Sequence, residues 1–126
     1  MKLRLVRIVW IALLISVLAA GCASDSPEDI ARNFYTAFER HEYTEAKKLA
    51  CEHLQDELEL WRREVGEVVI DVEFDVKYEL VSKDDESQTF KLTGTRAFAG
   101  ETYAVNYEIR VDKGEDGWQV CNMAAL

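Results

Sequence analysis

Arg96 is the residue whose chemistry would depend most on its surroundings. Counting back from the expected turn at 99–100 places it opposite Tyr103, and the preceding strand brings Phe74 to its other side. A guanidinium among aromatic side chains in a pocket could bind a carboxylate or another anion through charge-assisted hydrogen bonds. In the alternative arrangement, its aliphatic stem lies on apolar surface and the guanidinium points into water. We expect this second arrangement, because Arg96 lies near the end of a strand.

Residue types suited to acid–base catalysis or to metal binding are present, but they are scattered along the chain. His41 falls in a turn between two helices and His53 near the start of a helix, so they do not have the spacing of metal ligands. The acidic segments 84–86 and 112–116 lack the ligand order of a calcium loop and are typical of solvated turns. We therefore expect no catalytic set, no metal ion and no cofactor.

The cysteine at position 22 follows a leader with a recognisable layout. Lys2, Arg4 and Arg7 form a basic start, and the apolar run over 8–20 is too short to span a bilayer. Small residues then precede Cys22 in the sequence LAAGC. This arrangement resembles the lipobox of bacterial lipoproteins, in which the cysteine receives a diacylglyceryl group.

The lipobox resemblance implies three segments. Residues 1–21 would be the signal peptide, residues 22–26 the lipidated Cys22 with a short tether, and residues 27–126 a single domain. The lipid would hold the domain on the extracytoplasmic face of a bacterial cell membrane. An ordinary cleaved signal peptide and an uncleaved anchor are the alternatives.

The two remaining cysteines, Cys51 and Cys121, form an even number in an exported chain, which favours a disulfide. Two buried free thiols are the alternative. If Trp118 and Val120 face the core, simple alternation along the last strand turns Cys121 outward, away from Cys51. A β-bulge or a position near the sheet edge would reconcile the disulfide with the strand.

The charge of the chain excludes some partners. It has 15 Lys and Arg against 24 Asp and Glu, a net charge of −9. Three of the basic residues belong to the leader, so the mature chain would carry 12 basic residues and a charge of −12. This balance argues against nucleic acid and against electrostatic binding to anionic lipid, so the lipid itself would be the membrane tether.

Hydrophobic periodicity predicts helices first and strands afterwards. Ser26 followed by Pro27 is a strong helix start, Thr44 could cap a second helix, and Gly66 suits the end of a third. From Val68 the apolar period changes to two. The expected helices cover 27–40, 44–50 and 54–65, and the expected strands cover 68–80, 90–98, 101–111 and 118–123.

The register of the strands follows from the turn at 99–100. It pairs Phe98 with Glu101 and Phe90 with Ile109, and it keeps the apolar side chains on one face. Pairing Leu80 with Phe90 in the first hairpin preserves that face. Gly94 then lies mid-strand on the apolar face, where a glycine often marks a bend.

These elements form an α+β domain whose helices cover one face of an antiparallel meander. The segments SPEDIARNFYTAFERHEYTEAKKLA and DGWQVCNM resemble the nuclear transport factor 2-like superfamily, in particular its small bacterial lipoproteins. The resemblance implies N-terminal helices packed on a strongly curved four-stranded antiparallel sheet, a cone with a pocket at its wide end. We expect Arg96, Tyr103, Phe74, Phe34 and Trp61 to line that pocket.

The resemblance implies a fold more firmly than an activity. We expect a membrane-anchored, non-enzymatic domain that binds a small molecule or a protein partner in the bacterial envelope. The alternative is a small isomerase, dehydratase or hydrolase that uses the cone pocket. A homodimer through the sheet face is a further expectation.

Overall fold

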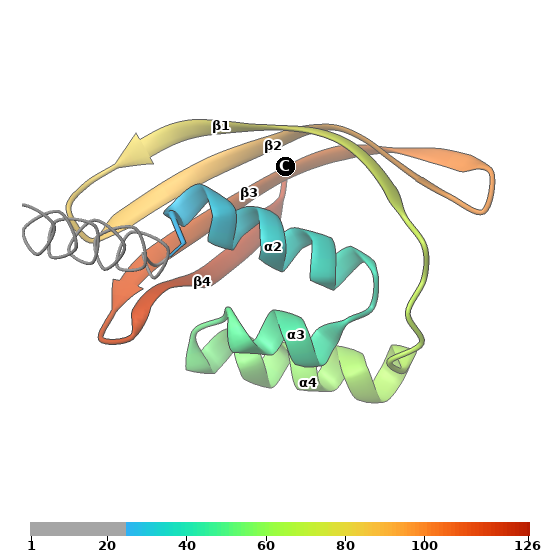
Figure 1. Ribbon diagram of the computed structural model, residues 1–126, viewed down its shortest axis with the longest axis horizontal. Helices are drawn as coiled ribbons and strands as arrows, with labels where there is room; N and C mark the ends of the chain where they lie inside the picture. Colours follow the sequence, from blue (N-terminus) through green and yellow to red (C-terminus); the bar gives the residue numbers. More distant parts are fainter. Residues whose placement is uncertain (1–24) are drawn as a thin grey trace, which may run out of the picture.

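Three helices precede a four-stranded antiparallel sheet with the strand order β1-β2-β3-β4. The computed structural model describes residues 25–126 (Figure 1), so the predicted signal peptide and Cys22 lie outside the described residues. The expected α+β class is confirmed. The elements are α2 (Pro27–Glu39), α3 (Tyr43–Lys48), α4 (Glu52–Val65), β1 (Glu73–Lys83), β2 (Ser87–Phe98), β3 (Glu101–Gly114) and β4 (Gly117–Ala125).

The long helices begin and end where local chemistry predicts. The Ser26 side chain accepts a hydrogen bond of 3.2 Å from the backbone N–H of Asp29, and Pro27 occupies the first turn of α2. Gly66, with φ of 83°, ends α4.

The short helix α3 departs from the prediction, because it begins at Tyr43 and Thr44 does not cap it. A distant side chain takes over that role. The backbone N–H of Thr44 donates to the Glu67 carboxylate over 2.7 Å, which satisfies a free N–H of the first turn.

The first strand begins five residues later than expected. Glu73 pairs with Ala97, one residue before β2 ends, so the segment 66–72 has no partner strand left to extend the ladder. This segment has no regular secondary structure, and the N–H of Ile70 donates to the carbonyl of Arg40 over 3.1 Å. The loops 84–86 and 115–116 are shorter than predicted because all four strands continue further into them, β1 as far as Lys83.

The predicted register is confirmed in both hairpins. Phe98 pairs with Glu101, and Phe90 pairs with Ile109 on one side and Leu80 on the other. Gly94 has φ of 143°, and a Cβ at this position would collide with the backbone carbonyl of Asp75. Only glycine therefore permits the close approach of β1 and β2 at this point.

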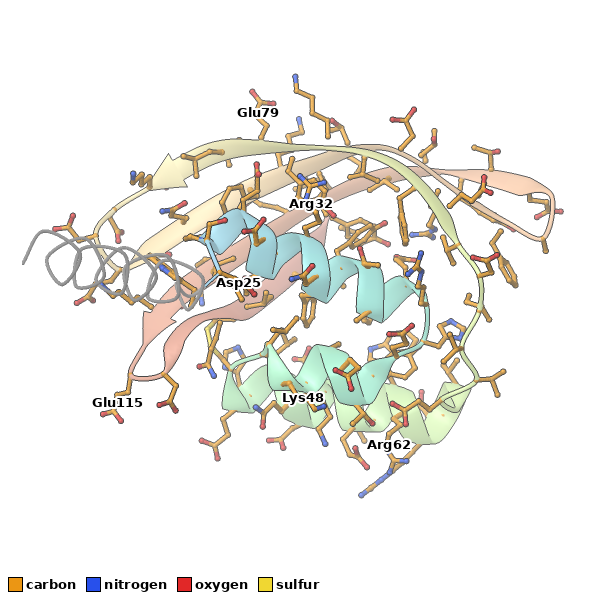
Figure 2. All side chains as sticks on the ribbon, in the orientation of Figure 1. Asp25, Arg32, Lys48, Arg62, Glu79 and Glu115 are labelled. Atoms are coloured by element: carbon orange, nitrogen blue, oxygen red, sulfur yellow. A yellow bond between two sulfur atoms is a disulfide. The ribbon has the colours of Figure 1, made fainter. Side chains whose placement is uncertain are left out.

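The curved sheet wraps around α2, with α3 and α4 on the other side of that helix (Figure 1). Glu79 points away from the helices on the outer face of the sheet (Figure 2). Between the layers lies a core of fully buried side chains. Its largest members are Phe34, Tyr35, Leu58, Leu92, Ile109, Val111 and Val120. Among residues 25–126, no helix is long and apolar enough to cross a membrane.

Candidate functional site

A pocket of about 390 Å³ opens between the second half of α2, the inner face of α4 and the sheet. Most of its wall is apolar. Phe38 lies at the centre of an aromatic cluster, with ring centroids 6.3 Å from Phe34, 5.9 Å from Tyr43 and 6.1 Å from Trp61. These contacts hold the rings in defined positions, and Trp61 remains 47% exposed at the opening. We call this cavity the main pocket.

The polar wall of the main pocket contains an ion pair between the end of α2 and β2. Arg96 Nη1 lies 2.7 Å from Glu39 Oε1, and the two side chains are 25% and 13% exposed. The guanidinium therefore points into the fold rather than into water, contrary to our expectation. The reason is that α2 ends beneath Arg96 and presents a carboxylate to it.

Burial governs the ionisation of this pair. Burial raises the pKa of Glu39 above its ordinary value, although the positive charge of Arg96 opposes the shift. Burial disfavours the charged form of Arg96, but the nearby hydroxyls of Tyr107 and Tyr35 together with Glu39 raise its pKa. The pair therefore combines a permanent cation with a carboxylate that is easier to protonate than usual.

Tyr35 lies close to this ion pair, but it is not one of the residues that line the main pocket. Its side chain is fully buried, and its hydroxyl has no hydrogen-bond partner among the described residues. Burial and the charge of Glu39 raise its pKa, so the phenol stays protonated. Because Tyr35 lines neither this pocket nor another cavity beside the ion pair, its hydroxyl belongs to the surroundings of the pair and not to a cavity wall.

A second, smaller cavity of about 210 Å³ lies on the other side of the ion pair. We call it the side pocket. Ile70, Val72, Phe98 and Tyr103 form its apolar wall. Glu39, His41 and Arg96 line both cavities, so these three polar residues separate one chamber from the other.

His41 occupies the turn between α2 and α3 in a left-handed backbone conformation with φ of 62°. Its ring stacks on Tyr43 with centroids 5.6 Å apart. Left-handed residues other than glycine are uncommon and often occur at functional sites. The turn thus places a titratable ring beside Glu39 and Arg96 in the walls of both pockets.

The predicted pocket residues are divided between three places. Arg96, Phe34 and Trp61 line the main pocket, and Arg96 and Tyr103 line the side pocket. Phe74 lines neither cavity, because it packs edge-on against Tyr35 with ring centroids 5.8 Å apart.

Sequence reasoning missed Glu39, His41 and Glu57, which complete the polar wall of the main pocket. One signal could have revealed Glu39. It lies four residues after Tyr35, so the two side chains share one face of α2 and follow the apolar stripe inward. The spacing does not reveal its partner, which is 57 residues away in the chain.

A disulfide joins Cys51 to Cys121, as the sequence predicts, with Cα atoms 4.9 Å apart. A β-bulge at Cys121 makes this pairing compatible with a buried Val120, because the register shifts between Arg110 and Val111. His53 Nε2 lies 2.6 Å from the carbonyl oxygen of Cys121. These contacts attach the start of α4, which forms a wall of the main pocket, to β4.

The comparisons with known proteins are consistent with this architecture. No protein-family model matches the sequence, and no curated protein matches it. A solved structure of a SEC-C motif containing protein from Rhodopseudomonas palustris is 15% identical, with a TM-score of 0.58, and the match covers 86% of this chain and 85% of that one. At this identity the likeness shows the fold alone.

A ketosteroid isomerase-like protein from Erwinia carotovora atroseptica also matches, with 20% identity and a TM-score of 0.48. This match covers 79% of the present chain and 92% of the other. Neither likeness assigns an activity to this chain, so its function has to be argued from the pocket.

Proposed function

We propose that this chain is a lipid-anchored protein of a bacterial envelope whose single domain binds a small, largely apolar molecule without transforming it. The observation that carries this proposal is the main pocket. Its volume of about 390 Å³ lies within the range of small-molecule sites, and aromatic walls converge on a few polar groups. A protein segment inserting an apolar side chain into the same pocket is the second kind of ligand that this site would suit.

The pocket proposal is tested by a pair of substitutions on α4. Val65 lines the opening of the main pocket, whereas Leu60 is exposed on the same helix and does not line it. We expect Val65→Trp to fill the opening and to weaken binding of the dye anilinonaphthalene sulfonate by about tenfold or more. Leu60→Trp should leave the dye affinity unchanged, and equal affinities in both variants would contradict the proposal.

The anchor part of the proposal rests on the leader sequence and on an even pair of cysteines joined in a disulfide. We expect the wild-type chain to be labelled by a fatty-acid analogue and to fractionate with membranes. Cys22→Ser should lose the label and release the folded domain. A Cys22→Ser chain that remains in the membrane fraction would indicate an uncleaved anchor instead.

An enzymatic function is the second candidate, and the position of Glu39 favours it. A pocket carboxylate whose pKa is raised by burial is a candidate for proton transfer. As a base it would take a proton from a carbon next to a carbonyl group and return it elsewhere on the substrate. The test is isomerisation of a β,γ-unsaturated ketone, which should occur in the wild type and stop in Glu39→Gln.

We propose a homodimer through the outer face of the sheet as a third candidate, and it is the least supported of the three. That face carries polar and charged residues such as Glu79, Lys91 and Thr93. Such a face favours hydration over self-association. Light scattering of the full chain in nanodiscs should give the mass of the protein. A protein mass equal to that of a monomer at high concentration would rule out the dimer.

A further inference from the structure

We infer that the main pocket takes an apolar carboxylate, which binds Arg96 in place of Glu39 while Glu39 takes up one proton from solvent. This inference rests on the proposed binding function and adds the charge of the ligand and the proton that accompanies it. It follows from two features of the ion pair: its contact geometry and the unequal chemistry of its partners.

The contact geometry leaves room for a better partner. The hydrogen bond between the two side chains joins one guanidinium nitrogen, Arg96 Nη1, to one oxygen, Glu39 Oε1. A guanidinium binds a carboxylate most strongly through two parallel hydrogen bonds. Glu39 is held by its helix and does not form that arrangement. A free ligand in the main pocket could adopt it.

The chemistry of the two partners is unequal. Arginine keeps its charge at every pH relevant to proteins, whereas a glutamate becomes neutral by binding one proton. A carboxylate ligand that displaces Glu39 from Arg96 would leave a poorly solvated anion, since this side chain is only 13% exposed. Protonation removes that charge, and the raised pKa of Glu39 shows that burial already favours it.

A cationic ligand meets the opposite situation. It would pair with Glu39 and leave Arg96 without a counter-charge, and no proton can be removed to neutralise the guanidinium. A neutral ligand would bind without disturbing the pair. The order of affinity should therefore be anion, neutral molecule, cation, although the protein as a whole is acidic.

Several other titratable groups lie around Glu39. Burial raises the pKa of Tyr35 and of Tyr43, so both remain neutral. Arg40 lines neither cavity, and its Nη2 donates to the carbonyl of Val72 over 3.4 Å. The groups that share the cavities with Glu39 are His41 from the turn, Tyr43 from α3, Glu57 from α4, Arg96 from β2, and Tyr103 and Tyr107 from β3.

His41 lines both cavities and is a second group that could take up the proton, since an imidazole ring can bind one. The two sources can be separated by substitution. His41→Asn removes the titratable ring and keeps a residue type that tolerates the left-handed backbone. Glu39→Gln removes the carboxylate and keeps the shape of the side chain.

The experiment uses three probes that share a naphthalene ring and differ in the charge of their end group: naphthylacetate, naphthylacetamide and naphthylethylamine. The full chain in phosphatidylcholine vesicles is titrated by calorimetry, with protein-free vesicles as the blank. Measurements in phosphate and in Tris buffer at neutral pH give the number of protons taken up. Glu59→Gln on α4 is the control variant, since Glu59 lines neither pocket.

We expect naphthylacetate to bind at least about tenfold more tightly than naphthylethylamine and to take up close to one proton. In Glu39→Gln the uptake should vanish, and the affinity for naphthylacetate should rise about tenfold or more, because the competing carboxylate is gone. Arg96→Gln should abolish the preference for the anion. Glu59→Gln should behave like the wild type.

Several results would overturn the inference while the pocket proposal stands. They are equal affinity for anion and cation, binding of naphthylacetate without proton uptake, and uptake that disappears in His41→Asn but persists in Glu39→Gln. Failure of all three probes to bind at millimolar concentration would overturn the pocket proposal and this inference together.

Discussion

Glu39 and Glu59 are both helical glutamates paired with arginine, yet their pKa values shift in opposite directions. Glu39 has one cationic partner in the wall of a pocket, and burial raises its pKa. Glu59 contacts Arg62, Lys47 and Arg63 on the surface of α4 and α3. Hydrogen bonds from Arg62 and then Lys47 lower its pKa to about 2.

The difference shows that the solvent around an ion pair decides what the pair can do. Arg62 points outward from α4 (Figure 2), so water hydrates both charges of the surface group. Glu59 therefore stays ionised, and its role is local stabilisation. Glu39 has fewer cations and less water, so a ligand or a change of pH can alter its charge. Four predictions test this contrast, in order of decreasing effect.

The largest effect should come from removing the disulfide, because it fixes α4, which carries Glu59 and also forms a wall of the main pocket. Cys51→Ser with Cys121→Ser frees a loop with a sequence separation of 70 residues. We expect the free energy of unfolding to fall by about 4 kcal/mol in urea titrations. Two alkylatable thiols in the unreduced wild-type protein would contradict the bridge.

Gly94→Ala should disturb the Glu39 region alone. The added Cβ would meet the carbonyl of Asp75, so β1 and β2 must separate close to Arg96. We expect a loss of about 3 kcal/mol in the free energy of unfolding. Gly100→Ala is the matched control: nothing lies near its Cβ, and only its positive φ of 80° opposes alanine, at about 1 kcal/mol. Equal losses would show that the close approach at Gly94 does not matter.

Replacing the two arginines compares the regions directly. Arg96→Ala removes the single partner of a poorly exposed carboxylate, and we expect a loss of about 2 kcal/mol near neutral pH. Arg62→Ala should change thermal stability little, because Glu59 keeps Lys47 and Arg63 and is well hydrated. A larger loss for Arg62→Ala than for Arg96→Ala would reverse the comparison.

The pH dependence of stability should have opposite signs at the two glutamates. Glu39 has a raised pKa in the folded state, so its contribution is present below its ordinary pKa of 4.5 and is lost as the pH rises through the folded value. Glu59 has a lowered pKa, so its contribution is present above 4.5 and is lost as the pH falls towards about 2.

The corresponding variants should remove these slopes. Urea unfolding across pH should show that Glu39→Gln gains stability relative to the wild type as the pH rises, and that Glu59→Gln gains relative to the wild type as the pH falls below 4.5. Curves that run parallel to the wild type in both variants would contradict the assigned pKa shifts.

Much of the fold could be predicted, because its rules are local. Ser26 and Pro27 start α2, Gly66 ends α4, and the turn at 99–100 sets the register of β2 and β3. The start of β1 could not be predicted in the same way. Alternation continues from Val68, but pairing begins only at Glu73, where β2 offers a partner.

The candidate site was predictable only in part. Arg96 and the aromatic residues could be placed on the inner face, since side-chain alternation depends on the strand alone. Glu39 could not be matched to Arg96, because their contact depends on where the end of α2 docks against the sheet. The bulge that turns both Val120 and Cys121 inward likewise depends on the neighbouring strand.

The sequence by itself determined the order of helices and strands, the apolar face of the sheet, the strand register and the two cysteines that could pair. Backbone preferences and side-chain periodicity act over a few residues, so they can be read along the chain. Only the tertiary structure decided that Glu39, His41 and Arg96 share the walls of two cavities. Their charge states depend on packing and on the exclusion of water, and both arise only when distant segments meet.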